Sequence, residues 1–136
     1  MIYLDASAIV TLISGRHGSA SLRDALDARG DMPMATSTVG FIETVRTMDR
    51  IGSYPTLMTD LVRDFTEILI TQEVREAAAA LPSGVRTLDS LHIASAQMLG
   101  PDLHLFISYD RRMLAIANLV DLPTAAPGLG PNPVPF

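Results

Sequence analysis

Four acidic residues stand where their oxygens could gather around a metal ion, although they lie far apart in the 136-residue chain. Asp5 directly follows a short apolar run that is typical of a strand, and Asp110 lies three residues after Ile107, the end of a later predicted strand. Asp89 falls in the first turn of a predicted helix, and Glu43 lies on another. Ligands of open parallel sheets bind outside the carboxyl ends of the strands. We therefore expect the four carboxylates to meet in one acidic pocket that holds a divalent metal ion.

Each acid also has a purely structural interpretation. Asp5 and Asp110 have the character of helix N-caps, and Asp89 favours the positive end of its helix. Glu43 lies three residues before Arg46, which is the spacing of a surface ion pair. For each residue taken alone, these interpretations stay open.

The neighbours of two of these acids favour a shared site. Glu43 follows Ile42, within a predicted apolar face of the helix at 38–51, and Asp89 stands in the largely apolar segment TLDSLHIASAQML. A helix that is apolar nearly all round is buried, and an isolated buried charge is very costly. Such carboxylates need arginines or a cation as partners, and one divalent cation explains several carboxylates in one place.

Composition limits the class of protein and the kind of metal site. The chain has no cysteine, so a metal ion would be held by oxygen or imidazole. A net charge of −5 argues against a protein that coats nucleic acid, although the carboxylate cluster of a nuclease would itself add negative charge. The chain shows no basic leader and no run of about 18–20 apolar residues, so we expect a cytoplasmic protein without a membrane span.

Predicted strands alternate with predicted helices, which indicates an α/β fold with a parallel sheet covered on both faces. The predicted strands span residues 2–4, 34–36, 65–70, 103–107 and 120–122. The predicted helices span residues 7–13, 19–28, 38–51, 54–64, 72–81, 88–99 and 110–119. We expect one domain over residues 1–123 and an extended tail over residues 124–136, which are rich in proline and glycine.

Several of these segments together resemble the PIN-domain family. The matching pieces are YLDASAIV around Asp5, Glu43 on a mid-chain helix, TLDSLHIASA around Asp89 and SYDRRM around Asp110. Within that family the chain is most similar to the VapC toxins of bacterial VapBC toxin–antitoxin pairs, from its first residue to about residue 123. The resemblance implies a PIN-like three-layer fold, with a central, mostly parallel sheet of about four to five short strands flanked by helices.

The same resemblance implies an activity and its site. It implies an endoribonuclease that depends on Mg²⁺ or Mn²⁺ and cleaves cellular RNA, with transfer RNA and ribosomal RNA as candidate substrates. Asp5 and Asp89 match the direct metal ligands, and Glu43 and Asp110 match the other two acidic positions. All four are therefore expected to be catalytic.

The surroundings of these acids carry further expectations. Ser7 and Ser108 match hydroxyl positions of the family, which would orient a carboxylate or a metal-bound water. Arginines near the acids in sequence are candidates to meet RNA phosphates: Arg46, Arg86, Arg111 and Arg112. His92, one helical turn after Asp89, is expected to pack or hydrogen-bond rather than to bind metal. The resemblance also implies a VapB-like antitoxin and a homodimer, with the helices of residues 39–58 as interface candidates.

Two other classes of function stay open at this point. One is an interaction module that holds a structural metal ion without turnover. The other is a phosphotransfer domain of the haloacid-dehalogenase-like or receiver-like type, in which an aspartate after the first strand accepts phosphate. The haloacid-dehalogenase-like type requires a second aspartate two residues after the first, where this chain has Ser7. The receiver-like type requires a lysine, which the chain lacks.

Overall fold

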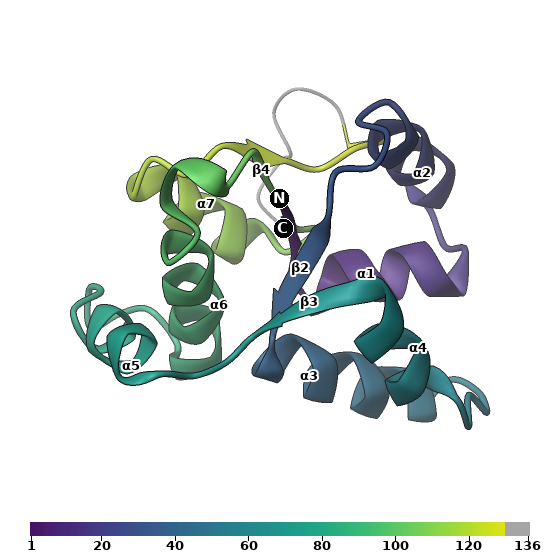
Figure 1. Cartoon of the computed structure of the whole chain (residues 1–136), viewed down its shortest axis with the longest axis horizontal. Helices are drawn as coiled ribbons and strands as arrows, with labels where there is room; N and C mark the ends of the chain where they lie inside the picture. Colours follow the sequence, from purple (N-terminus) through teal and green to yellow (C-terminus); the bar gives the residue numbers. More distant parts are fainter. Residues whose placement is uncertain (130–136) are drawn as a thin grey trace.

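Five short strands form one sheet at the centre of the computed structural model, which describes residues 1–129 (Figure 1). The strands are β1 (Ile2–Leu4), β2 (Met34–Ser37), β3 (Phe65–Ile68), β4 (Leu105–Ile107) and β5 (Thr124–Ala125). Their order in the sheet is β3-β2-β1-β4-β5, and every neighbouring pair is parallel.

Helices connect the strands and cover both faces of the sheet (Figure 1). They are α1 (Ala6–Ser14), α2 (Ser19–Asp27), α3 (Thr38–Asp49), α4 (Leu57–Asp64), α5 (Gln72–Ala79), α6 (Thr87–Gln97) and α7 (Arg111–Leu119), with a 3₁₀ turn at Gly100–Asp102. No helix within residues 1–129 combines the length and apolar character that crossing a membrane requires. The arrangement confirms the predicted three-layer α/β fold with a central parallel sheet.

Alternate side chains of the central strands pack into two separate hydrophobic cores. Ile2 and Leu4 of β1 belong to the core that includes side chains of α1, α3 and α4. Tyr3, between them, belongs to the second core, where it stacks on Phe106 with ring centroids 5.2 Å apart and meets side chains of α6 and α7. Successive side chains of a strand point to opposite faces, so a strand buried on both faces reads as a continuous apolar run.

The strand order reverses at β1, and this reversal positions the site. After β1 the chain adds β2 and β3 on one side, and later β4 and β5 on the other side. The carboxyl ends of β1 and β4 therefore open on a crevice from which their connections diverge in opposite directions. Asp5 directly follows β1, and Ser108 directly follows β4, so the two residues meet at this crevice.

Two predicted inward faces are wrong in detail. The sequence pattern places Ile42 in the buried face of α3, but Ile42 is 48% exposed and the buried face includes Phe41, Thr44 and Met48. The pattern also places Val62 inward on α4, where it is 59% exposed. Both errors have one cause: apolar residues next to the buried stripe satisfy nearly the same periodicity as the stripe itself.

The predicted edge strand at 120–122 is also wrong. Val120 ends α7, and Asp121 then takes the left-handed conformation with a φ of 62°. The chain turns there before it pairs with β4 as β5, so the strand begins later than the apolar residues indicate.

Part of the predicted tail lies along the sheet. Residues 124–125 form β5, and the Tyr109 hydroxyl donates to the Pro127 carbonyl at 2.7 Å. The domain boundary at residue 123 stays a prediction. Residues 130–136 of the predicted tail lie outside the described residues.

Candidate functional site

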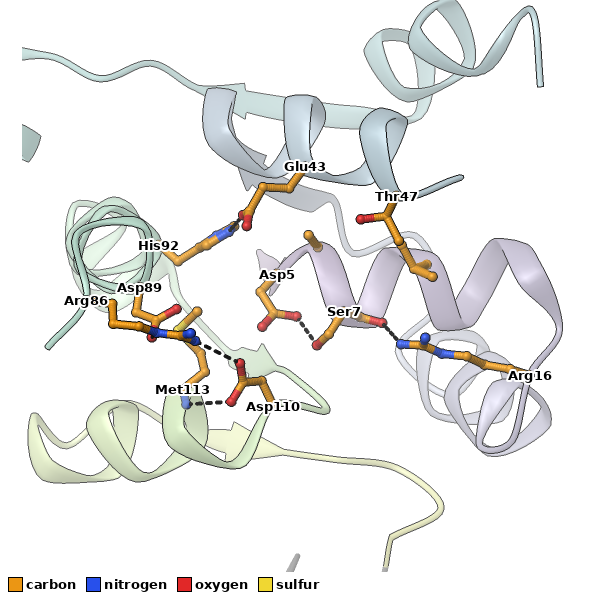
Figure 2. Close-up of a pocket in the computed structure, with 12 residues that line it drawn as sticks. Asp5, Ser7, Arg16, Glu43, Thr47, Arg86, Asp89, His92, Asp110 and Met113 are labelled. Atoms are coloured by element: carbon orange, nitrogen blue, oxygen red, sulfur yellow. Dashed lines mark hydrogen bonds and ion pairs between the residues drawn. The ribbon is translucent and has the colours of Figure 1, made fainter. Parts of the chain in front are cut away.

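The structure brings the four predicted acids to the wall of one pocket of about 260 Å³ (Figure 2). Each acid comes from a different helix or its cap. Asp5 caps α1 and Asp110 caps α7, while Glu43 lies within α3 and Asp89 lies in the first turn of α6. Carboxylates that the sequence separates widely therefore share one small, polar cavity.

Both carboxylate oxygens of Asp5 accept hydrogen bonds. Oδ1 accepts the Ala8 amide at 3.0 Å and the Ser7 hydroxyl at 2.6 Å. Oδ2 accepts the Ser108 hydroxyl at 2.5 Å. The Tyr109 amide donates to the Ser7 hydroxyl at 2.9 Å, which fixes that hydroxyl in turn. One side chain thus serves as both helix cap and pocket wall, and the two serines hold its orientation.

Burial makes the charge of Asp5 costly. The residue is 2% exposed, and burial raises the pKa of the Asp5 carboxyl above its ordinary value. The hydrogen bonds from Ser108, Ser7 and Ala8 oppose this effect but only partly offset it. A cation in the pocket would favour the ionised carboxylate, because an opposite charge stabilises the charged form.

Glu43 has a buried histidine as its partner. Its Oε1 lies 2.7 Å from Nε2 of His92, while the side chains of the two residues are 33% and 2% exposed. The contact confirms the expectation that His92 forms hydrogen bonds. Because Glu43 also lines the pocket, its bond to the buried His92 connects the pocket wall to the protein interior.

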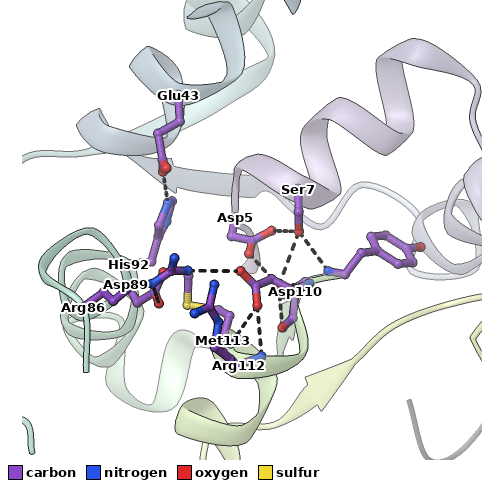
Figure 3. Close-up of polar contacts among 11 residues, drawn as sticks. Asp5, Ser7, Glu43, Arg86, Asp89, His92, Asp110, Arg112 and Met113 are labelled. Atoms are coloured by element: carbon purple, nitrogen blue, oxygen red, sulfur yellow. Dashed lines mark hydrogen bonds and ion pairs between the residues drawn. The ribbon is translucent and has the colours of Figure 1, made fainter. Parts of the chain in front are cut away.

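One arginine reaches the two remaining acids (Figure 3). Nε of Arg86 donates to Oδ2 of Asp89 at 3.1 Å, and Nη2 lies 3.7 Å from Oδ2 of Asp110. The other oxygen of Asp110 accepts the amides of Arg112 and Met113, as a helix cap does. The Arg86 side chain is 53% exposed, so it can move away without opening the core.

In this arrangement the four acids do not form a preformed metal-binding site. Among residues 1–129, no group of three or more His, Cys, Asp or Glu side chains converges closely enough to hold a metal ion. The contacts give the reason, because Glu43 turns to His92 while Arg86 occupies Asp89. The donor set still fits Mg²⁺ or Mn²⁺, since Mg²⁺ is usually bound by one or two carboxylates and keeps several waters.

The four arginines predicted to meet phosphate take different places. Arg86 lines the pocket itself, and Arg112 lines an adjoining cavity of about 270 Å³ together with Arg86. Arg46 is exposed on α3, and Arg111 is the first residue of α7. Neither of these two is among the residues that line the pocket.

Arg16 is a pocket residue that the sequence pattern does not predict. Its Nε donates to the Thr11 hydroxyl at 2.9 Å and its Nη2 to the Ser7 carbonyl at 3.1 Å. Figure 2 shows Arg16 and Arg86 on opposite sides of Asp5. The signal in the sequence is weak: an arginine directly follows the glycine that ends a helix.

The chain is similar to known proteins over nearly its whole length. A family model described as PIN domain matches residues 2–119. "Ribonuclease VapC47" from Mycobacterium tuberculosis (strain CDC 1551 / Oshkosh) is 34% identical over 133 residues, which cover 94% of this chain and 98% of that protein. "Ribonuclease VapC35" from the same strain is also 34% identical, with the same coverage.

Solved structures share the fold at lower identity. A toxin–antitoxin complex from Klebsiella pneumoniae aligns over 100% of both chains, with a TM-score of 0.69 and 20% identity. The VapC20 structure from Mycobacterium tuberculosis, described as a sarcin–ricin loop cleaving toxin, aligns with a TM-score of 0.67 and 17% identity over 85% of this chain and 94% of that one. The family match and the 34% identity together show that the chain belongs to the PIN domain family and, within it, to the VapC-type proteins.

Proposed function

We propose that this protein is a Mg²⁺- or Mn²⁺-dependent endoribonuclease and the toxin of a type II toxin–antitoxin pair. The observation that carries the proposal is the gathering of four carboxylates around one pocket at the reversal of strand order. Membership in the PIN domain family and the ribonuclease names of the relatives support the same activity.

Asp5 and Asp89 are the proposed metal ligands. Both are buried, at 2% and 6% exposure, and both line the pocket with carboxylate oxygens, which hard cations prefer. Ser7 and Ser108 hold Asp5 in one orientation through its two oxygens. When bound, a divalent metal lowers the pKa of a coordinated water and stabilises negative charge on the leaving oxygen.

Glu43 and Asp110 complete the catalytic set. Glu43 orients the attacking water and accepts its proton as the phosphorus–oxygen bond to the leaving ribose oxygen breaks. Asp110 has a narrower task, because one of its oxygens caps α7 while the other lies toward Arg86. It holds the arginine near the reacting phosphate.

Arginines on the rim of the site are the proposed phosphate contacts. The guanidinium of Arg86 is exposed and would be able to turn from Asp89 to an RNA phosphate if that carboxylate held a metal ion, and its planar fork matches a phosphate well. Arg112 would extend this contact through the adjoining cavity, and Arg46 and Arg111 would meet phosphates farther along the strand.

The proposed substrate is structured or single-stranded cellular RNA in the cytoplasm. Single-stranded loops are the usual targets of sequence-specific recognition, because their bases can be splayed out. Transfer RNA and ribosomal RNA both offer such loops. The structural neighbour VapC20 is a toxin that cleaves the sarcin–ricin loop, which is consistent with a loop as the target of this chain.

Removing a proposed metal ligand should abolish cleavage. We expect Asp5→Asn and Asp89→Asn each to lower the rate on labelled cellular RNA by about 100-fold or more, because the amide binds a cation poorly. The rate is measured with Mn²⁺, with and without chelator, and metal binding is measured by calorimetry. Asp31→Asn, at an exposed acid outside the pocket lining, is the matched control.

Two outcomes would contradict this assignment. Cleavage by the folded double variant Asp5→Asn/Asp89→Asn at the wild-type rate would exclude these residues as the catalytic ligands. Metal binding by the wild-type protein without cleavage of any cellular RNA would indicate a non-catalytic metal-binding module.

Arg86 should compete with the metal ion for Asp89. We expect Arg86→Gln to bind Mn²⁺ about 3- to 5-fold more tightly without RNA, because the ion no longer displaces a guanidinium. The same variant should show a higher KM for RNA. Arg29→Gln, at an exposed arginine outside the pocket lining, controls for the change in net charge. Unchanged or weaker Mn²⁺ binding by Arg86→Gln would refute the competition.

The raised pKa of Asp5 predicts that the metal-free protein loses stability as the pH rises. Below the ordinary aspartate pKa, both folded and unfolded chains carry the proton. As the pH rises toward the raised pKa, the unfolded chain releases its proton first, so unfolding becomes easier. We therefore expect the free energy of unfolding of Asp5→Asn to exceed that of the wild-type protein by a margin that grows as the pH rises above the ordinary aspartate pKa. Urea denaturation in chelator measures this margin, and a margin that stays constant would contradict the effect.

A homodimer and an antitoxin complex are the proposed assemblies. Apolar side chains stay exposed on α3, α4 and the segment between them: Ile42, Ile51, Tyr54, Met58 and Val62. The structural neighbours include a toxin–antitoxin complex and VapBC2 bound to a promoter DNA fragment. Light scattering should give a dimer mass for this chain and a larger mass after addition of a small DNA-binding protein encoded beside it. A monomer mass at micromolar concentration would contradict the dimer, and an unchanged mass after the addition would contradict that partner.

A further inference from the structure

A buried line of polar groups runs from the central strand to the pocket. The Tyr3 hydroxyl of β1 lies 2.6 Å from Nδ1 of His92 on α6, and Nε2 of His92 lies 2.7 Å from Oε1 of Glu43 on α3. Tyr3 is 0% exposed and His92 is 1% exposed. Figure 3 shows the His92 ring directed at Glu43, away from the other labelled acids.

The contact with Tyr3 bears on which ring nitrogen of His92 carries the proton. A buried hydroxyl needs an acceptor for its proton, and Nδ1 of His92 lies within hydrogen-bonding distance. A neutral imidazole that accepts at Nδ1 carries its own proton on Nε2. Nε2 then donates to Glu43.

A neutral donor suits a carboxylate that must act on water. The Glu43 side chain is one-third exposed, and its bond to His92 holds Oε1 in place while Oε2 stays available to the pocket that Glu43 lines. Arg86, by contrast, brings a full positive charge to Asp89. A cation at the position of His92 would cancel the charge of Glu43, whereas a neutral imidazole orients the carboxylate and leaves that charge intact.

We propose that His92 is a positioning residue for the Glu43 carboxylate and that Tyr3 sets the tautomer of His92. This inference rests on the proposed function in one respect, namely that Glu43 orients the attacking water. The geometry of the three residues also makes a claim that is independent of RNA cleavage, because the tautomer is a property of the protein alone.

The tautomer can be measured directly by ¹⁵N NMR of the full chain labelled at histidine. The chain has three histidines, so His17→Gln and His104→Gln assign the signal of His92. We expect a protonated Nε2 and an unprotonated Nδ1 at neutral pH, and a mixture of tautomers in Tyr3→Phe. A proton on Nδ1 in the wild-type protein, or an unchanged tautomer in Tyr3→Phe, would overturn the role of Tyr3.

Kinetics on RNA test the positioning role. His92→Gln keeps an N–H donor for Glu43, whereas His92→Leu fills the core without one. We expect His92→Leu to lower kcat by about 10-fold or more with little change in KM, and His92→Gln to recover most of the loss. Thermal unfolding of both variants controls for the fold. Equal losses in the two variants, or a wild-type kcat in His92→Leu, would overturn the proposal.

The outcomes separate this inference from the proposed function. If Glu43→Gln cleaves RNA at the wild-type rate, the proposed role of Glu43 is wrong and the positioning role falls with it, while the NMR result still decides the tautomer. If Glu43→Gln is inactive but His92→Leu is fully active, the ribonuclease proposal stands and the positioning role is refuted.

Discussion

Burial of carboxylate charge at the pocket is the constraint that the rest of this structure must satisfy, because removal from water disfavours the ionised form of Asp5. Helices α1, α6 and α7 offset part of the cost of this negative charge, because they begin beside the pocket and their positive ends favour nearby anions. Side-chain contacts offset the remaining cost. Asp5 accepts neutral hydroxyls, Glu43 meets an imidazole, and Arg86 carries a cation to Asp89 and Asp110.

These partners differ in what they leave for a metal ion. Hydroxyl and imidazole donors orient a carboxylate and leave its charge to attract a cation. A guanidinium cancels the charge it contacts until it moves away, and Arg86 is exposed enough to do so. The pocket therefore combines acids that are set in place by the core with acids whose counter-charge can be exchanged.

The same elements that build the core also carry the site. Tyr3 and His92 belong to the packing around α6, and the alternation of β1 turns Tyr3 to that side while Ile2 and Leu4 face the other. A strand of three residues can do this only because both of its faces are covered by helices. Packing changes in the second core would therefore reach Glu43 through His92.

The sequence by itself determined which residues follow the strands, and hence that Asp5 and Asp110 lie at one edge of a parallel sheet, because strand ends and helix caps are local signals. The motifs that resemble the PIN-domain family were also evident from the sequence alone. Only the tertiary structure decided the partners, since the bonds of Glu43 to His92 and of Arg86 to Asp89 and Asp110 depend on how separate helices pack. The exposure of Ile42 and the late start of β5 were likewise decided by packing, because periodicity cannot choose between adjacent stripes of a helix or locate an edge strand.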